Sequence, residues 1–318
     1  MSQHIVIGGG SGFIGTELKR ALEDRGDRVT LISRTPGDQR ITWDQLQEEG
    51  LPQCDVVINL AGKHILDMSR FWTAKYRDEV VRSRIETTKC LVESINNAAE
   101  PPSLFISTAG KCFYGSQAFQ RQEQYLDMDE ASDPVGIDFP SQLVSTWEAA
   151  ADEIDTSIVR HTKLRFGIVL AEQFDRKLAT NGNRGIFPLL RQCFTAGLCM
   201  SLGSGVQPFP WVHIDDVVGI TLRAIDDARA EGIYNVVAPG IVSNQEFSEL
   251  LATKLGRKVL GKVPAWLIKA IVGIERSTIL LLGQRVRPSR SLEQGYRFKF
   301  PDLDSCLTNL TTRSTGGA

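Results

Sequence analysis

The chain has 318 residues, of which 42% are hydrophobic and 23% charged, and its formal net charge is -2. This length accommodates one large domain or two modest ones, and the composition is typical of a soluble globular protein rather than a disordered or membrane-embedded one. Because there is no basic excess to attract nucleic acid or anionic lipid, we expect neither as a partner.

The N-terminus and the cysteines favour a cytoplasmic protein. The opening MSQHIVIGGG reaches glycines before any long apolar run, unlike a secretory signal. None of the six cysteines forms a CxxC pair, so no zinc ribbon or redox motif is expected. The apolar stretch 266–282 contains Lys269, Glu275 and Arg276, so we expect a packed helix there and not a membrane span.

Up to residue 170 the sequence alternates short β-rich runs with longer amphipathic stretches. Strands are expected at 4–7, 28–32, 56–60, 104–107 and 157–170, and helices at 12–25, 75–97 and 143–154. Such alternation indicates βαβ units around a parallel sheet. The predicted fold class is α/β, with a Rossmann-type doubly wound parallel sheet in residues 1–170 to which some later segments return.

The second half of the chain is punctuated by Gly and Pro and has fewer strand-like runs. A strand is expected at 232–237 and helices at 244–255 and 264–282, so residues 171–310 are expected to form a smaller, mostly helical substrate region. The polar stretch 113–138 is expected to be a long loop, which in compact domains is often functional. Residues 311–318 are expected to be a disordered tail.

Glycines follow the first predicted strand in GGGSGFIG, with Gly9, Gly12 and Gly15 at GxxGxxG spacing. Gly9 permits a tight turn, Gly12 lets the backbone approach a pyrophosphate, and Gly15 lets the next helix pack closely on the sheet. Phe13 and Ile14 open that helix, where free N–H groups and a partial positive charge favour phosphates. The order of strand, glycines and helix predicts a dinucleotide site.

The second predicted strand ends at Ser33 and Arg34, where an NAD site usually has an acidic residue for the ribose 2′-hydroxyl. A hydroxyl and a guanidinium suit a 2′-phosphate, so the sequence predicts NADP(H) rather than NAD(H), and the alternative is a solvated surface arginine. The third strand ends in Leu60, Ala61 and Gly62, small or apolar residues that let a cofactor come close. The alternative there is a strand that simply stops at Gly62.

Further motifs extend these signals along nearly the whole chain: STA at 107–109, YG at 114–115, SRIETT at 83–88, WEAA at 147–150, LRFGIVL at 164–170 and FPWVHIDD at 209–216. With them the chain resembles the extended short-chain dehydrogenase/reductases and, more narrowly, the YfcH-type NAD(P)-dependent epimerase family. GQRV at 283–286 is similar to part of that family's small C-terminal domain, at about 263–310. The resemblance implies cofactor contacts by the glycine loop, Ser33, Arg34, Leu60, Ala61, Glu79, Arg84 and Val169.

The usual proton-transferring Tyr and the Lys four residues after it have no counterpart. Matching Glu148 with the acid that follows this pair in extended members places Pro140 and Val144 at the two positions, and neither side chain transfers a proton. Tyr114 and Ser107 are therefore the candidate catalytic residues, with a packing or substrate-contact role as the alternative for Tyr114.

His213 with Asp215 and Asp216 also suggests a metal site, but no further ligand is in view, so no metal is predicted and a structural role is favoured. Asp215 is a candidate cap for the following helix. The sequence contains no Walker lysine after the glycines, no GxSxG and no HExxH, which disfavours phosphoryl transfer and hydrolysis.

Two functions fit these patterns. The first is an NADP(H)-dependent oxidoreductase or nucleotide-sugar-epimerase-like protein acting on a small-molecule substrate held between the sheet domain and the C-terminal part. The second is an inactive NADPH-sensing module that regulates a protein partner, which the missing Tyr and Lys favour. Extended relatives often form a homodimer through a helical bundle, which here would involve residues 75–97 and 143–154.

Overall fold

The computed structural model describes residues 2–67, 70–115, 126–134, 136, 138–172 and 185–312. Its largest element in this part of the chain is a seven-stranded parallel sheet in the order β11-β7-β5-β4-β1-β2-β3. The strands are β1 His4–Gly8, β2 Arg28–Ser33, β3 Arg40–Thr42, β4 Val56–Asn59, β5 Leu104–Gly110, β7 Arg160–Phe166 and β11 Gly232–Val236. The order reverses between β1 and β4, the switch point at which such sheets bind ligands.

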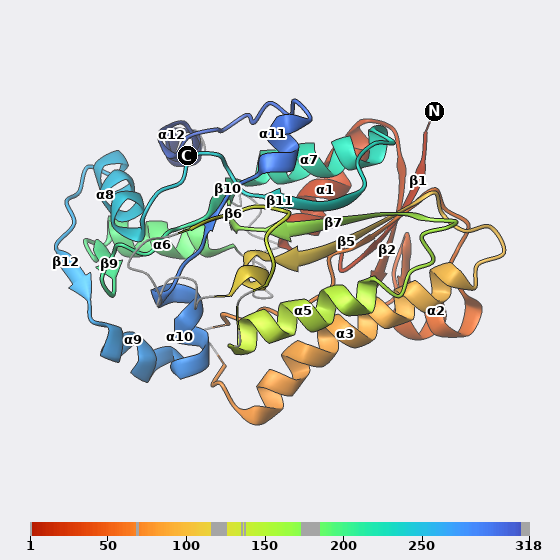
Figure 1. Ribbon diagram of the computed structural model, residues 1–318, viewed down its shortest axis with the longest axis horizontal. Helices are drawn as coiled ribbons and strands as arrows, with labels where there is room; N and C mark the ends of the chain where they lie inside the picture. Colours follow the sequence, from red (N-terminus) through yellow and green to blue (C-terminus); the bar gives the residue numbers. More distant parts are fainter. Residues whose placement is uncertain are drawn as a thin grey trace.

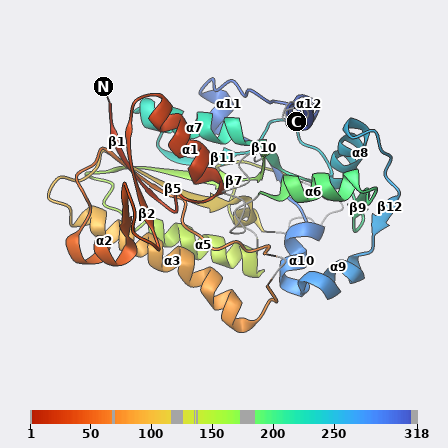
Figure 2. The same ribbon diagram turned by 180° about the vertical axis from the view of Figure 1, so that it is seen from behind.

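Helices cover both faces of this sheet (Figures 1 and 2). On one face lie α1 Phe13–Asp24 and α7 Ile214–Asp226, and on the other lie α2 Trp43–Glu49, α3 Ala74–Asn96 and α5 Phe139–Ala151. Strands that are buried on both faces are apolar at nearly every position. This explains why the sequence has short, continuous apolar runs at these strands and no alternation of apolar and polar residues.

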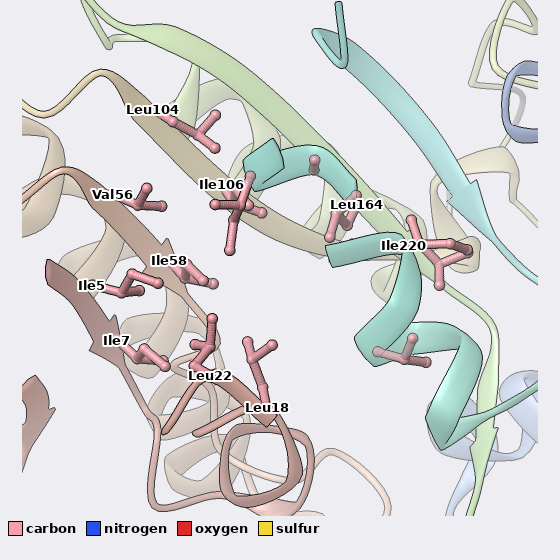
Figure 3. Close-up of a cluster of buried hydrophobic side chains, with 14 of the residues drawn as sticks. Ile5, Ile7, Leu18, Leu22, Val56, Ile58, Leu104, Ile106, Leu164 and Ile220 are labelled. Atoms are coloured by element: carbon pink, nitrogen blue, oxygen red, sulfur yellow. The ribbon is translucent and has the colours of Figure 1, made fainter. Parts of the chain in front are cut away.

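Alternate residues of each strand belong to different cores. Ile5 and Ile7 of β1 pack with Leu18 and Leu22 of α1 (Figure 3), whereas Val6 between them belongs to the core under α3. β1 and β4 are paired up to Gly8 and Asn59, so their carboxyl ends lie side by side between the two cores. The α/β doubly wound prediction is confirmed.

The structure contains the predicted strands and helices, but two of them are each divided into two elements. The run 157–170 forms β7 and the separate strand β8 Ile168–Leu170, because the chain leaves the sheet at Gly167, where a Cβ would lie 2.8 Å from the Pro210 oxygen. The run 264–282 forms two helices, α9 Ala265–Val272 and α10 Ile274–Leu281, separated by Gly273 at φ +85°. That backbone conformation suits glycine and ends a helix.

The stretch predicted as the loop 113–138 is not wholly irregular. It begins inside the 3₁₀ helix η1 Lys111–Tyr114 and contains β6 Asp127–Met128, which pairs with β13 Arg285–Val286. This pairing ties the stretch to the C-terminal region. Its residues 116–125, 135 and 137 lie outside the described part of the chain.

A second apolar core lies beyond the carboxyl ends of β5 and β7 and is built by α6, α8 and α12 (Figure 1). The second half of the chain contributes α6 Ile186–Thr195, β9 Met200–Leu202, β10 Trp211–His213, α8 Asn244–Lys254, β12 Gly261–Val263, α11 Ser289–Glu293 and α12 Leu303–Thr312. Because α12 includes Thr311 and Thr312, the prediction of disorder is wrong for these two residues, and 313–318 lie outside the described residues.

Within the described ranges, no helix combines the length and the hydropathy that crossing a bilayer requires.

Candidate functional site

The glycine turn, residues 9–12 between β1 and α1, lies at the switch point of the sheet. Gly9 has φ +73°, and a Cβ there would lie 2.7 Å from the backbone N and Cα of Ala61. A Cβ on Gly15 would lie 2.6 Å from the Gly10 oxygen, so α1 packs directly on the turn. Only glycine fits these two positions, and the spacing seen in the sequence is explained by contacts on both sides of the turn.

Helix α1 begins at this turn without a side-chain cap. Gly12 is its N-cap, and its first turn contains Phe13 and Ile14 but no acidic residue. The first backbone N–H groups of a helix have no intrahelical acceptor, and they favour an anion. The turn and the helix start therefore provide the donor set and the partial charge that a pyrophosphate needs.

A buried hydrogen-bond chain fixes the end of β4 opposite the turn. The Asn59 Oδ1 accepts from the N–H of Ala61 at 3.0 Å, and its Nδ2 donates to the Thr88 Oγ1 at 2.8 Å. Trp147 Nε1 donates to the same hydroxyl at 2.9 Å. Leu60 donates its N–H to the Gly8 oxygen at 2.8 Å. Helices α3 and α5 thus position the backbone that faces Gly9.

Sequence reasoning missed this positioning chain. Asn59 has 0% exposed surface in an otherwise apolar strand, and a buried amide needs partners. That polar residue at the end of an apolar run was the available signal. Thr88 and Trp147 have no periodic signal in the sequence and stand only within the motifs SRIETT and WEAA.

The end of β2 presents one exposed cation. Ser33 is buried, and its hydroxyl donates to the Thr35 oxygen at 2.5 Å, whereas Arg34 is exposed. No carboxylate in the described ranges pairs with Arg34. β2 is adjacent to β1, so Arg34 lies on the same edge of the sheet as the glycine turn.

Helix α3 brings two further predicted contact residues to the loop after β4. The Glu79 carboxylate accepts from Lys63, which lowers its pKa, and it pairs with Arg70 at 3.7 Å. Arg84 donates to the oxygens of Lys63 at 2.8 Å and Val80 at 3.1 Å, and does not join Glu79.

The Arg84 side chain packs against Gly62, the third residue after β4. A Cβ on Gly62 would lie 3.2 Å from its guanidinium carbon, and the guanidinium lies over the Trp147 ring at 5.2 Å. Burial lowers the pKa of Arg84 to about 10. Arg84 therefore holds the backbone of the loop, and its remaining N–H groups are the part available to a ligand.

The two candidate catalytic residues lie at β5 and just after it. Tyr114 is 0% exposed; its hydroxyl donates to the Asn235 Oδ1 at 2.8 Å and accepts from Arg165 at 3.0 Å. Burial raises its pKa. Ser107 is buried, with its Oγ 2.8 Å from the His161 Nε2. This geometry supports the packing alternative for Tyr114.

The histidine and acids after β10 have structural partners. His213 caps α7 by accepting the Asp215 N–H at 3.0 Å, so the cap is the histidine and not Asp215. Asp216 accepts from the backbone N–H groups of Lys299 at 2.7 Å and Phe300 at 3.0 Å. These bonds tie residues 299–300, before α12, to α7, which is the structural role expected for the motif. Val169, which the resemblance implies as a cofactor contact, lies on β8 and pairs with Val212 of β10.

A doubly wound parallel sheet whose switch point carries a glycine turn and an uncapped helix start defines a dinucleotide-binding protein of the Rossmann class. Comparison with known proteins identifies the family. Residues 5–237 match the NAD dependent epimerase/dehydratase family, to which this chain belongs, and residues 263–310 match a domain of unknown function (DUF1731). The resemblance drawn from the motifs is confirmed.

Similar proteins span nearly the whole chain. It is 41% identical over 304 residues to epimerase family protein SDR39U1 of Bos taurus, covering 95% of this chain and 98% of the relative. The crystal structure of human SDR39U1 (isoform 2) with NADPH is 38% identical, covers 97% of this chain and 99% of the other, and has a TM-score of 0.88. A UDP-glucose 4-epimerase from Thermotoga maritima, with UDP-glucose, is 16% identical, covers 98% and 99% of the two chains, and with a TM-score of 0.74 shows the fold alone.

Proposed function

We propose that this protein binds NADP(H) at the switch point and is an oxidoreductase or nucleotide-sugar-epimerase-like protein acting on a small substrate. The observation that carries the proposal is the glycine turn, where Gly9 lies against Ala61 and α1 starts without a side-chain cap. A pyrophosphate fits that donor set because it needs N–H groups and close backbone approach. The crystal structure of human SDR39U1 with NADPH supports the choice of cofactor.

NADP(H) is proposed over NAD(H) on the strength of Arg34. An exposed guanidinium beside Ser33 at the end of β2 suits the 2′-phosphate, with which it forms charge-assisted hydrogen bonds. A solvated arginine without any ligand role is the alternative.

The remaining contacts are proposed in two groups. Leu60, Ala61 and Gly62 form the first group and offer backbone groups just after β4. The second group consists of side chains from other elements: Glu79 and Arg84 lie on α3, and Val169 lies on β8. When bound, the cofactor would supply hydride chemistry, and this chain would supply its orientation.

One observation favours the second candidate, an NADPH-sensing module without turnover. Pro140 and Val144 occupy the buried face of α5 at the positions of the missing pair, and a Cβ on Gly110 at the end of β5 would lie 3.9 Å from a Val144 methyl. Neither side chain transfers a proton. A cytoplasmic location and a homodimer through α3 and α5 remain predictions from the sequence.

A hydride-transfer assay separates the two functions. Purified protein loaded with NADPH is mixed with a panel of small aldehydes and ketones, and NADPH absorbance is followed. Protein loaded with NADP⁺ is mixed with a panel of nucleotide sugars, and the products are separated by chromatography, because epimerisation consumes no cofactor. NADPH oxidation or an epimerised product with one compound class supports the enzyme. Tight NADPH binding without either reaction across both panels supports the sensor, and failure to bind NADPH contradicts both.

A further inference from the structure

Lys111 is a buried cation at the edge of the sheet where the cofactor is proposed to lie. It follows Gly110, the last residue of β5, and opens η1. β5 is the neighbour of β4, whose end faces the glycine turn. The Lys111 side chain is 5% exposed, and lysine is almost never this buried without a paired charge.

The partner of Lys111 is neutral. Its Nζ donates to the Gln284 Oε1 at 2.8 Å, and in the described ranges no carboxylate lies within ion-pair distance of it. Burial lowers the pKa of Lys111, against smaller opposing effects of Cys112 beside it and Asp138 at the start of α5. A buried ammonium held by one neutral amide is costly, so a functional reason for it is expected.

Lys111 also lines a cavity between the sheet and the C-terminal region. Gln207 and Asn244 supply other polar groups of the lining, and Ile168, Phe209 and Leu280 supply apolar walls. The side chain therefore reaches from the cofactor edge towards the region expected to hold the substrate.

The other titratable candidates at β5 are engaged elsewhere. The Tyr114 hydroxyl is held between Asn235 and Arg165, and the Ser107 hydroxyl is held by His161. Helix α5 has Pro140 and Val144 where the usual pair would be. Of the described residues that line this cavity, Lys111 is the one with a transferable proton.

We propose that Lys111 is the proton donor to a carbonyl oxygen of the substrate, an inference that rests on the proposed function. When bound, NADPH would supply a hydride from its nicotinamide ring to the carbonyl carbon and would be left as NADP⁺. The carbonyl oxygen keeps the electron pair of the broken C=O π bond and takes a proton from the Lys111 ammonium, which yields a hydroxyl group. Lys111 is left as a neutral amine and regains its proton from water, while Gln284 holds its Nζ in place.

The first test needs no substrate. In ¹⁵N-lysine-labelled protein, with the Lys111 signal assigned by its loss in Lys111→Arg, the Lys111 pKa is measured by NMR with NADPH and with NADP⁺. A lysine facing the nicotinamide should have a pKa lower by about one unit with NADP⁺, because the oxidised ring carries a positive charge. Lys163, paired with Asp152 after α5, is the internal control and should not change.

Equal Lys111 pKa values in the two complexes would overturn the proposal while leaving NADP(H) binding intact. If neither nucleotide binds, the proposed function fails and this inference falls with it. The same samples thus distinguish the two failures.

The second test uses compounds that the wild-type protein reduces. Lys111→Met should bind NADPH within about threefold of wild type and reduce the carbonyl about 100-fold more slowly, with the pH dependence of the rate lost. Lys262→Met, an exposed lysine of β12, is the matched control and should have wild-type rates. A Lys111→Met protein with the wild-type rate and pH profile would contradict the proton-donor role.

Discussion

Arg34 is the residue on which the distinction between the two nicotinamide cofactors depends. Arg34→Ala should raise the Kd for NADPH by about 10- to 100-fold, the loss of charge-assisted hydrogen bonds to a phosphate, and leave the Kd for NADH nearly unchanged. Calorimetric titration of both cofactors measures this. Arg229→Ala, which removes an exposed arginine paired with Asp227, is the control. An equal rise in the Kd for NADPH and for NADH would refute the role of Arg34 in binding the 2′-phosphate.

Tyr114 is expected to stabilise the core and not to transfer a proton. Tyr114→Phe removes the donor to Asn235 and an acceptor for Arg165, so the free energy of unfolding should fall by about 1–2 kcal/mol. Urea unfolding measures this loss. NADPH binding and any carbonyl reduction should stay at wild-type levels. A stable variant that has lost carbonyl reduction would restore Tyr114 as the donor.

At this scale the sequence predicted the glycines well and the polar partners poorly. Gly9 and Gly15 are recognisable because only glycine satisfies the turn and the close helix contact at fixed spacing. Asn59 and Lys111 could not be assigned, because their partners Thr88 and Gln284 are 29 and 173 residues away. Side-chain pairing over such distances has no periodic signature in a single sequence.

Among the elements, β7 and α5 are joined by a buried ion pair. Arg165 and Glu148 are 2% and 5% exposed and form two hydrogen bonds at 2.7 and 2.8 Å. Glu148→Gln keeps the shape but leaves the guanidinium without its counter-charge, so it should cost about 3–5 kcal/mol of unfolding free energy. Denaturant unfolding measures the loss.

Glu153→Gln provides the matched control for that variant. Glu153 lies just after α5, is exposed and is 3.6 Å from Lys89, so the change should cost less than about 1 kcal/mol. Similar small losses for both variants would contradict a structural role for the Arg165–Glu148 pair.

The elements themselves were predictable where one buried strand alternates with one amphipathic helix, as in β1 with α1. Prediction failed where the backbone changes direction without a change in composition. Gly167 separates β7 from β8 because Pro210 approaches it, and Gly273 separates α9 from α10 by its positive φ. The apolar patterns on either side of each glycine are continuous, so the sequence favoured one long element.

The stability of the whole molecule should depend on pH through His161. This ring is 6% exposed, stacks on Phe105 and has its pKa lowered by burial from 6.5 to about 4. Below about pH 6.5 the unfolded chain gains a proton that the folded chain excludes, so stability falls as the pH drops towards 4. Between about pH 7 and pH 5 the loss from this group should be about 2 kcal/mol.

His161→Phe isolates that contribution. The variant is expected to be less stable overall, because Ser107 loses its partner, but its unfolding free energy should fall less steeply below pH 6.5 than that of wild type. Urea unfolding curves at a series of pH values provide the comparison. Parallel pH profiles for the two proteins would show that His161 is not the group responsible.

At the scale of the whole molecule, the glycine turn and Arg34 are proposed to bind NADP(H) together. Calorimetric titration of the ligand-free protein with NADPH, and separately with NADH, tests it most directly. We expect one NADPH bound per chain, with a Kd at least about tenfold lower than that for NADH. An absence of binding by both cofactors, or an equal affinity for the two, would contradict it.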